Sequence, residues 1–312
     1  MLDSLPKTKQ LKHLIDIASL SEADIMNIVD LASLMQKDKY IPSLKDKTVV
    51  LLFAENSTRT KLSFEVAAQN LEMKILRFDA NTSSLAKGES LKATVDNLYQ
   101  IGADAIVLRH SVSGILNNLI SQIDYPVSFL NAGDGNRAHP TQALLDFYTM
   151  VKHHKTVKNK KITIIGDISH SRVARSNIEL LTKFGADVHV CAPSYFKPYD
   201  IEKYGITYHK ELIPAIKDAE VVMCLRVQTE RHEKSLYPRL SEYINSYRLD
   251  SAKVQKYCGK NVIIMHPGPA NCGVEVSEEL LNGEYGKTIL EQVKNGVYIR
   301  MAVLHILLGS TK

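Results

Sequence analysis

Phe53-Ala54-Glu55-Asn56-Ser57-Thr58-Arg59-Thr60-Lys61-Leu62-Ser63-Phe64-Glu65 is the stretch from which the fold of this 312-residue chain can be predicted. The residues that lead into it, 47–53, read Lys-Thr-Val-Val-Leu-Leu-Phe. This run is β-branched and apolar without alternation, which predicts a strand buried on both faces. The apolar residues from Leu62 onward fit a helix that packs against such a sheet. Ser57 and Thr58 therefore lie where a buried strand ends and a helix begins.

This junction has the chemistry of an anion site. Free backbone N–H groups at a helix start, the hydroxyls of Ser57, Thr58 and Thr60, and the Arg59 guanidinium converge there. Such groups can hold a phosphate without a glycine-rich loop. The alternative is an ordinary helix start, with Ser57 or Thr58 as the N-cap and Arg59 as a solvated residue of the first turn.

Strands and helices alternate along the chain in two successive series. A βαβα order predicts parallel sheets with helices on both faces. We therefore predict an α/β fold of two doubly wound domains, residues 1–150 and 151–288, joined by interdomain helices. The predicted strands are 47–53, 74–78, 104–108, 127–130, 161–167, 187–191, 205–209, 220–225 and 261–265. The predicted helices are one that is capped by Ser21 or Ser19 and runs through Ile25 to Leu34, followed by 58–71, 89–101, 113–123, 141–153, 172–184 and 289–308.

Several classes of ligand are not expected. Gly166 stands alone where a dinucleotide site needs three glycines, and no P-loop occurs, which argues against NAD and ATP. Cys258, His266 and Cys272 fit no common zinc spacing, so neither metal nor cofactor is predicted. The net charge of +5 suits small anionic substrates rather than nucleic acid. The basic run 153–161 lacks aromatics and is interpreted as a solvated connection.

The cellular location is predicted from the N-terminal residues, the apolar runs and the cysteines. The first residues carry an acid and no long apolar core, and no apolar run approaches the ~20 residues that span a bilayer. The four cysteines are irregularly spaced, as is usual for reduced thiols. We expect a cytoplasmic protein without a membrane partner.

Polar residues follow the predicted strands, at the edge where parallel sheets bind ligands. Taken singly, each has an ordinary explanation, such as a surface ion pair or a hydrogen-bonded loop histidine. Together they form a strongly cationic cleft, which is costly without an anionic ligand. They are Ser57, Thr58, Arg59, Thr60, Ser84, Lys87, Arg109, His110, His139, Gln142, Arg172, Arg226, Gln228 and His266.

These segments, in their order along the chain, resemble those of the aspartate and ornithine carbamoyltransferase family. The resemblance to the aspartate-specific members of that family covers essentially the whole chain. The chain departs from many relatives at Cys272, where they carry Arg, and has one lysine in a loop where some have two. The matching pieces are Ser-Thr-Arg-Thr at 57–60, Ser-x-x-Lys-Gly-Glu at 84–89, Arg-His at 109–110, His-Pro-Thr-Gln at 139–142, His-Ser-Arg at 170–172, Arg-Val-Gln at 226–228 and His-Pro-Gly-Pro at 266–269.

The resemblance implies that the first domain binds carbamoyl phosphate and is completed by a C-terminal helix, 289–312. Phosphate would be held at Ser57, Thr58, Arg59 and Thr60. The implied catalytic groups are Arg59 and the donors to the carbonyl oxygen, which are Thr60, Arg109 and His139. The carbamoyl NH2 would be bound by Gln142 and by backbone carbonyls at Gly268 and Pro269.

The same resemblance implies that the second domain, 151–288, binds the acceptor. Arg172, Arg226, Gln228 and Lys87 suit the two carboxylates of L-aspartate, and the product would enter pyrimidine biosynthesis. An ornithine site would instead need a carboxylate for the side-chain amine, and another carbamoyl acceptor such as ornithine is the alternative. From other classes, a silent anion-binding subunit or a nucleotide-dependent oxidoreductase is considered. A silent subunit would have lost some of the residues that match the family motifs. A nucleotide-dependent oxidoreductase would need the glycines that this chain lacks.

The family resemblance also concerns assembly. It implies a homotrimer or a multiple of trimers in which Ser84 and Lys87 reach the active site of the neighbouring subunit. Glu55 is expected to pair with Arg172 or Arg231 across the domains rather than to act as a base. A regulatory chain or a dihydroorotase partner is left open.

Overall fold

The computed structural model describes residues 11–79, 85, 88–199, 201–227 and 240–309. The chain forms two compact units, the first made of Met1–Leu145 and Val293–Lys312 and the second of Asp146–Gln292. It passes between them twice, within the helices α5 (Pro140–His154) and α11 (Gly286–Leu308). The boundaries predicted from the sequence lie near 150 and 288.

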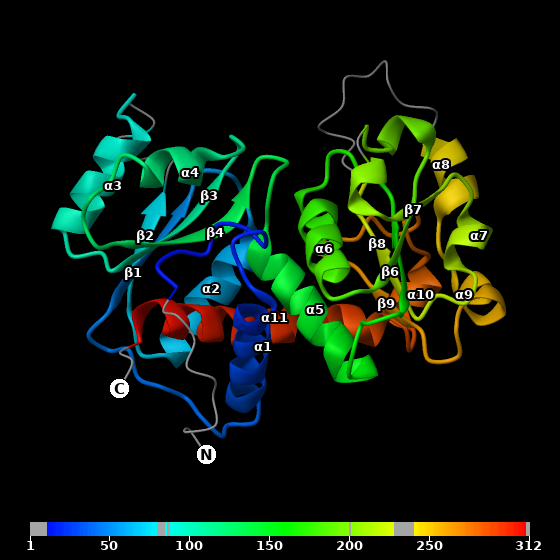
Figure 1. Cartoon of the computed structure of the whole chain (residues 1–312), viewed down its shortest axis with the longest axis horizontal. Helices are drawn as coiled ribbons and strands as arrows, with labels where there is room; N and C mark the ends of the chain where they lie inside the picture. The colour runs from blue at the N-terminus through cyan, green and yellow to red at the C-terminus, as the bar shows by residue number, and fades with distance from the viewer. Residues whose placement is uncertain (1–10, 80–84, 86–87, 200, 228–239, 310–312) are drawn as a thin grey trace. The chain divides into compact units, whose positions relative to one another are not determined.

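The first unit is built on a four-stranded sheet of order β2-β1-β3-β4, in which all neighbouring strands are parallel. Figure 1 shows α3 and α4 on one face of this sheet and α2 on the other. Its elements are α1 (Glu22–Gln36), β1 (Thr48–Phe53), α2 (Thr58–Asn70), β2 (Lys74–Asp79), α3 (Leu91–Gln100), β3 (Ala105–His110), α4 (Ile115–Ile120) and β4 (Ser128–Asp134).

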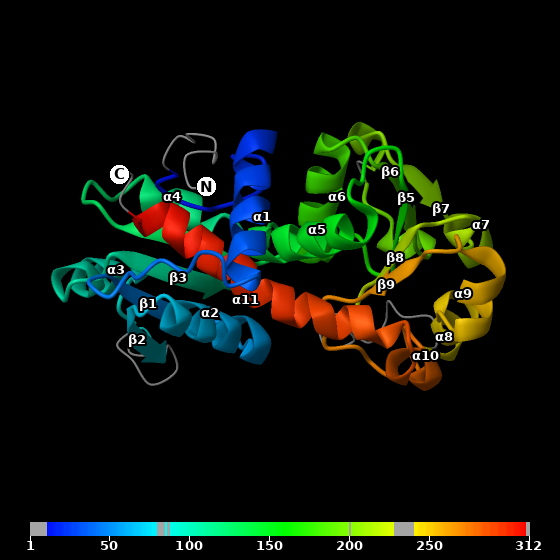
Figure 2. The same cartoon turned by 90° about the horizontal axis from the view of Figure 1, so that it is seen from below.

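The core of this unit explains why its strands lack alternation. Val50 and Leu52 of β1 pack in one cluster with Val95 of α3, Leu116 of α4 and Phe129 of β4. The other face of β1 is equally buried, because helices cover both sides of the sheet. α1 lies near α11 (Figure 2), and Gln36 Nε2 donates a hydrogen bond to Asn295 Oδ1 at 3.0 Å.

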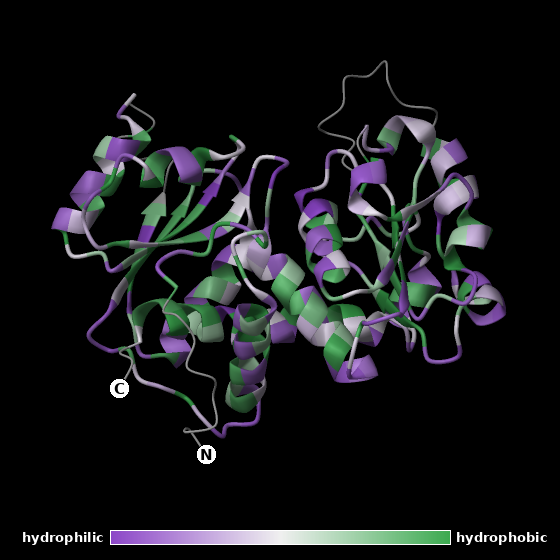
Figure 3. Ribbon diagram, viewed as in Figure 1, coloured by the Kyte–Doolittle hydropathy of each residue, from purple (hydrophilic) through white to green (hydrophobic). Residues whose placement is uncertain are grey.

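The second unit has a five-stranded parallel sheet of order β7-β6-β5-β8-β9. Hydrophobic residues dominate its strands and hydrophilic residues the outer turns of its helices (Figure 3). The elements are β5 (Lys161–Ile165), α6 (Arg172–Lys183), β6 (Asp187–Cys191), η3 (Ser194–Phe196), η4 (Ile201–Tyr204), β7 (Thr207–His209), α7 (Leu212–Ile216), β8 (Val221–Cys224), α8 (Leu240–Tyr247), α9 (Ser251–Tyr257), β9 (Ile263–Met265) and α10 (Glu278–Asn282).

The predicted α/β fold class with two parallel sheets is confirmed. One strand is longer than expected: β4 was predicted over 127–130 but continues to Asp134, because Asn131 and Asp134 are buried with hydrogen-bond partners. The short helices α7 to α10 were not predicted. None of the helices in the described part of the chain has the length and apolarity needed to cross a membrane.

Candidate active site

The junction between β1 and α2 forms as the sequence indicated. Ser57 is the N-cap residue, with φ −162° and ψ 96°, but its side chain makes no capping hydrogen bond. Thr58 and Arg59 are exposed in the first turn, whereas Thr60 is 7% exposed. The first N–H groups of a 13-residue helix are therefore not capped by the Ser57 hydroxyl, which favours the anion site over the ordinary cap.

Arg109 lies at the end of β3, next to this junction. It pairs with Phe53 in the strand register, and Ala54 N donates to its carbonyl oxygen at 2.9 Å. The Arg109 Nη1 donates to the Ala132 carbonyl at 3.3 Å, and Nε lies 3.5 Å from Glu55 Oε2. The guanidinium is thus positioned between the ends of three adjacent strands. Glu55 accordingly has a cationic neighbour within its own unit, and Arg231 lies outside the described residues.

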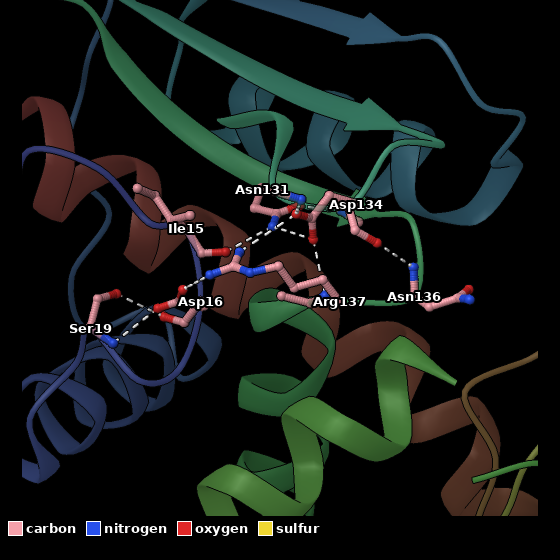
Figure 4. A network of polar contacts seen from close by, with 11 residues as sticks. Ile15, Asp16, Ser19, Asn131, Asp134, Asn136 and Arg137 are labelled. Carbon is pink, nitrogen blue, oxygen red and sulfur yellow. Dashed lines mark hydrogen bonds and ion pairs between the residues drawn. The ribbon is translucent and has the colours of Figure 1, made fainter. Parts of the chain in front are cut away.

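A buried polar network shapes the loop that follows β4 (Figure 4). The Asp134 carboxylate is 1% exposed and accepts hydrogen bonds from Asn131 Nδ2 at 3.1 Å and Ala138 N at 3.0 Å. Arg137 forms an ion pair with Asp16 and lies 3.5 Å from Asp134. The five residues fix the turn that directly precedes His139. This network was not predicted from the sequence.

His139 directly precedes α5 and Gln142 lies in its first turn, and both are buried, at 4% and 8% exposure. Gln142 N donates to the His139 carbonyl at 3.0 Å, which places the two residues in one helical turn. Because β1, β3 and β4 are neighbours and parallel, their following segments leave the same edge of the sheet. The structure therefore brings 57–60, Arg109 and His139 to one edge of the first unit.

The second unit presents its own polar edge. Arg172 is the first residue of α6 and is 7% exposed, and Ser171 caps that helix through a hydrogen bond from Ala174 N at 3.1 Å. Arg226 follows β8 and is half-buried. The Gly268-Pro269 pair follows β9, and its peptide bond is cis. Because β5, β8 and β9 are neighbouring parallel strands, these segments leave one edge of this sheet.

Glu275 links two of these segments and was not predicted. Its carboxylate, 1% exposed, accepts hydrogen bonds from Val227 N at 2.7 Å, Asn271 N at 2.8 Å and Asn271 Nδ2 at 2.9 Å. Burial raises the pKa of Glu275 above its ordinary value, and the hydrogen bonds oppose that shift. Cys272 is exposed, so the departure at this position leaves the contacts of Glu275 intact.

Three predicted site residues, Ser84, Lys87 and Gln228, lie outside the described residues. Among the described residues, no group of three or more histidines, cysteines and acids could hold a metal ion.

Two α/β units with parallel sheets, each with polar and basic side chains beyond the carboxyl ends of its strands, define the class of two-domain α/β proteins to which this chain belongs. Residues 12–152 match the carbamoyl-P binding domain of aspartate/ornithine carbamoyltransferases, and residues 158–307 match the Asp/Orn binding domain. The chain belongs to the aspartate/ornithine carbamoyltransferase family.

Two curated relatives are aspartate carbamoyltransferase catalytic subunits. The one from Opitutus terrae is 43% identical over 303 residues, which cover 96% of this chain and 95% of the relative. The one from Desulfotalea psychrophila is 44% identical over 306 residues, with the same coverage of 96% and 95%. The aligned residues extend over both units.

Solved structures agree with this assignment. Aspartate transcarbamoylase from Trypanosoma cruzi in complex with N-(phosphonacetyl)-L-aspartic acid aligns with a TM-score of 0.87 and 27% identity, covering 99% of this chain and 100% of that one. The same enzyme in complex with carbamoyl phosphate and aspartate gives a TM-score of 0.84 and 28% identity, with 95% and 97% coverage. Ornithine carbamoyltransferase from Thermus thermophilus, at 23% identity, shares the fold.

Proposed function

We propose that this protein transfers the carbamoyl group of carbamoyl phosphate to the amine of L-aspartate, giving N-carbamoyl-L-aspartate and phosphate. The observation that carries the proposal is the identity of about 43% to aspartate carbamoyltransferase catalytic subunits over 96% of the chain. A structural neighbour holds both substrates of that reaction.

The first unit supplies the phosphate site. The helix start at Ser57 and Thr58 presents N–H groups and hydroxyls, and Arg59 adds a charge-assisted donor beside them. A phosphate at this position is stabilised both as part of the substrate and as the leaving group. The site thus serves the group that departs in the reaction.

Carbamoyl transfer requires stabilised charge rather than a nucleophilic side chain. The aspartate amine forms a bond to the carbamoyl carbon, and negative charge develops on the carbonyl oxygen. Thr60, Arg109 and His139 are the proposed donors to this oxygen, and Gln142 with the Gly268 and Pro269 carbonyls binds the NH2 group. The C–O bond to phosphate then breaks, and the departing phosphate accepts the amine proton.

The acceptor is selected by charge. Arg172 and Arg226 lie at the polar edge of the second unit, and with Lys87 and Gln228 they complement two carboxylates. Ornithine would place an ammonium group among these cations. Aspartate is therefore the proposed acceptor, and ornithine is the alternative to be tested.

We further propose a cytoplasmic homotrimer that functions in pyrimidine biosynthesis, with Ser84 and Lys87 contributed to the neighbouring site. An exposed apolar surface on the first unit supports association. Leu62 and Val66, one turn apart on α2, are 54% and 41% exposed. Clustered exposed apolar residues of this kind are typical of protein interfaces.

A product assay tests the proposed reaction. The purified chain is supplied with carbamoyl phosphate and either L-aspartate or L-ornithine, without metal or nucleotide, and the carbamoylated amino acid and phosphate are quantified. We expect carbamoyl-aspartate and phosphate in equal amounts. Equal or faster turnover of ornithine would show that the acceptor has been assigned wrongly.

A further inference from the structure

A row of buried hydrogen bonds lies behind the loop that follows β9. His266 N donates to Gln292 Oε1 at 2.9 Å, and Gln292 Nε2 donates to Asp146 Oδ1 at 2.7 Å. Asn177 Nδ2 donates to the other carboxylate oxygen, Asp146 Oδ2, at 2.9 Å. Asp146 and Asn177 are fully buried, and Gln292 and His266 are each 2% exposed.

The row ends at a segment of the proposed active site. The His266 ring accepts a hydrogen bond at Nδ1 from Gly268 N at 2.8 Å, so His266 connects Gln292 to the Gly268-Pro269 pair. Asp146 and Gln292 are also the first and last residues of the second unit. Their hydrogen bond therefore joins α5 and α11 at the two points where the chain enters and leaves that unit.

The carboxylate at position 146 determines which way the Gln292 amide faces. A glutamine side chain can present either its oxygen or its NH2 group to a neighbour, whereas a carboxylate only accepts hydrogen bonds. Asp146 therefore turns Nε2 toward itself and leaves Oε1 facing His266 N. A reversed amide would place two donors against each other at His266.

We infer that Asp146 is a positioning residue for carbamoyl transfer, which acts through Gln292 and His266 on the Gly268 and Pro269 carbonyls. The inference rests on the proposed function, because these carbonyls are the proposed acceptors for the carbamoyl NH2 group. Asp146 itself does not touch the substrate.

Three variants separate this role from general stability. Asp146→Asn replaces an acceptor by a group that can accept only at one atom, although two amides donate to it. Gln292→Glu places a second carboxylate beside Asp146, at the position where Gln292 Nε2 donates to Asp146 Oδ1 at 2.7 Å in the wild type. The double variant D146N/Q292E exchanges the charge and preserves all three hydrogen bonds, since the new amide donates to the new carboxylate.

The readouts are kcat and KM for aspartate, with inhibition by inorganic phosphate as a measure of the first unit. Each single variant should lower kcat/KM for aspartate roughly tenfold or more, the effect of an unsatisfied buried group. The inhibition constant of phosphate should stay unchanged. The double variant should recover to within about threefold of the wild type, because coupled sites are non-additive.

Asn177→Ala is the matched control. It removes a buried donor from the same carboxylate but leaves the hydrogen bond between Asp146 and Gln292. We expect a lower melting temperature with kcat/KM close to the wild type. An equal loss of activity in this control, or weakened phosphate inhibition in the single variants, would show general loosening and overturn the inference.

Two further outcomes decide whether the role assigned to Asp146 stands. Folded single variants with wild-type kcat/KM contradict the role of Asp146. If a single variant does not fold, the double variant is compared with Asn177→Ala, and a double variant that folds but turns over more slowly than this control overturns the role. Absence of turnover in the wild type instead contradicts the proposed function, so the two failures are distinguishable.

Discussion

Arg59 shows how the site depends on single residues. Its side chain is exposed in the first turn of α2, so it contributes little to the core. We expect Arg59→Ala to lower kcat roughly hundredfold or more, because a preorganised donor to developing charge is lost. The free energy of unfolding should change by about 0.5 kcal/mol or less, as for other surface positions.

Steady-state kinetics and urea unfolding measure both effects. Lys61→Ala, a change of the next cation on the same helix, is the control and should retain activity. An Arg59→Ala variant with most of its turnover would identify Arg59 as a solvated residue of the first turn.

The positions of the proposed ligand-binding residues were easier to predict than the residues that hold them in place. Ser57 and Arg109 follow apolar strands, so their location at a sheet edge is visible locally. Glu275 and Asp146 act through long-range partners, and the Asp146 bond to Gln292 joins positions 146 residues apart. No local pattern marks such a pairing, although an acid between two valines at 274–276 is a usable signal for burial.

Two elements with strong apolar patterns were predicted nearly to the residue. The strand predicted over 187–191 is β6 itself, and the helix predicted over 172–184 ends at Lys183. α7 to α10 escaped prediction because helices of five to eight residues show at most about two turns of periodicity. Their apolar residues can be interpreted equally well as loop or strand.

The segment before α1 gives a prediction at the scale of an element. It lies along β4, where Phe129 N donates to His13 Nδ1 at 3.1 Å and Leu14 N donates to the Phe129 carbonyl at 2.8 Å. Burial, with Lys12 in addition, lowers the pKa of His13 from 6.5 to about 4. His13 is therefore neutral when it accepts this hydrogen bond.

A lowered pKa fixes the sign of the pH dependence. The neutral form of His13 stabilises the fold above the unfolded-state pKa of 6.5, and this contribution is lost as pH falls toward about 4. In urea unfolding, the wild type should lose stability relative to His13→Asn as pH falls from 7 to 4.5, because the Asn amide oxygen can replace Nδ1 but does not titrate. Parallel pH profiles would contradict the role of His13.

The whole molecule is proposed to work as a trimer with shared sites. Lys87→Ala and Arg59→Ala chains, each nearly inactive alone, are denatured together and allowed to reassemble. If Lys87 serves the neighbouring site, some mixed trimers contain one site with both native residues, and part of the activity returns. Reassembled single variants are the controls, and a mixture no more active than they are would place each complete site within one chain.

The two passages of the chain between its units also determine the order in which the protein can form during synthesis. Residues 146–292 are continuous and are all available once residue 292 has left the ribosome, whereas the first unit still lacks Met301, Ala302 and Leu304, which are fully buried in α11, until the residues after 292 have followed. The part translated later should therefore become protease-resistant first, the reverse of the usual order from the N-terminus. Limited proteolysis of stalled chains in which residue 292 is followed by an unstructured linker that fills the exit tunnel should reveal a protected second unit beside a first unit that is still cleaved.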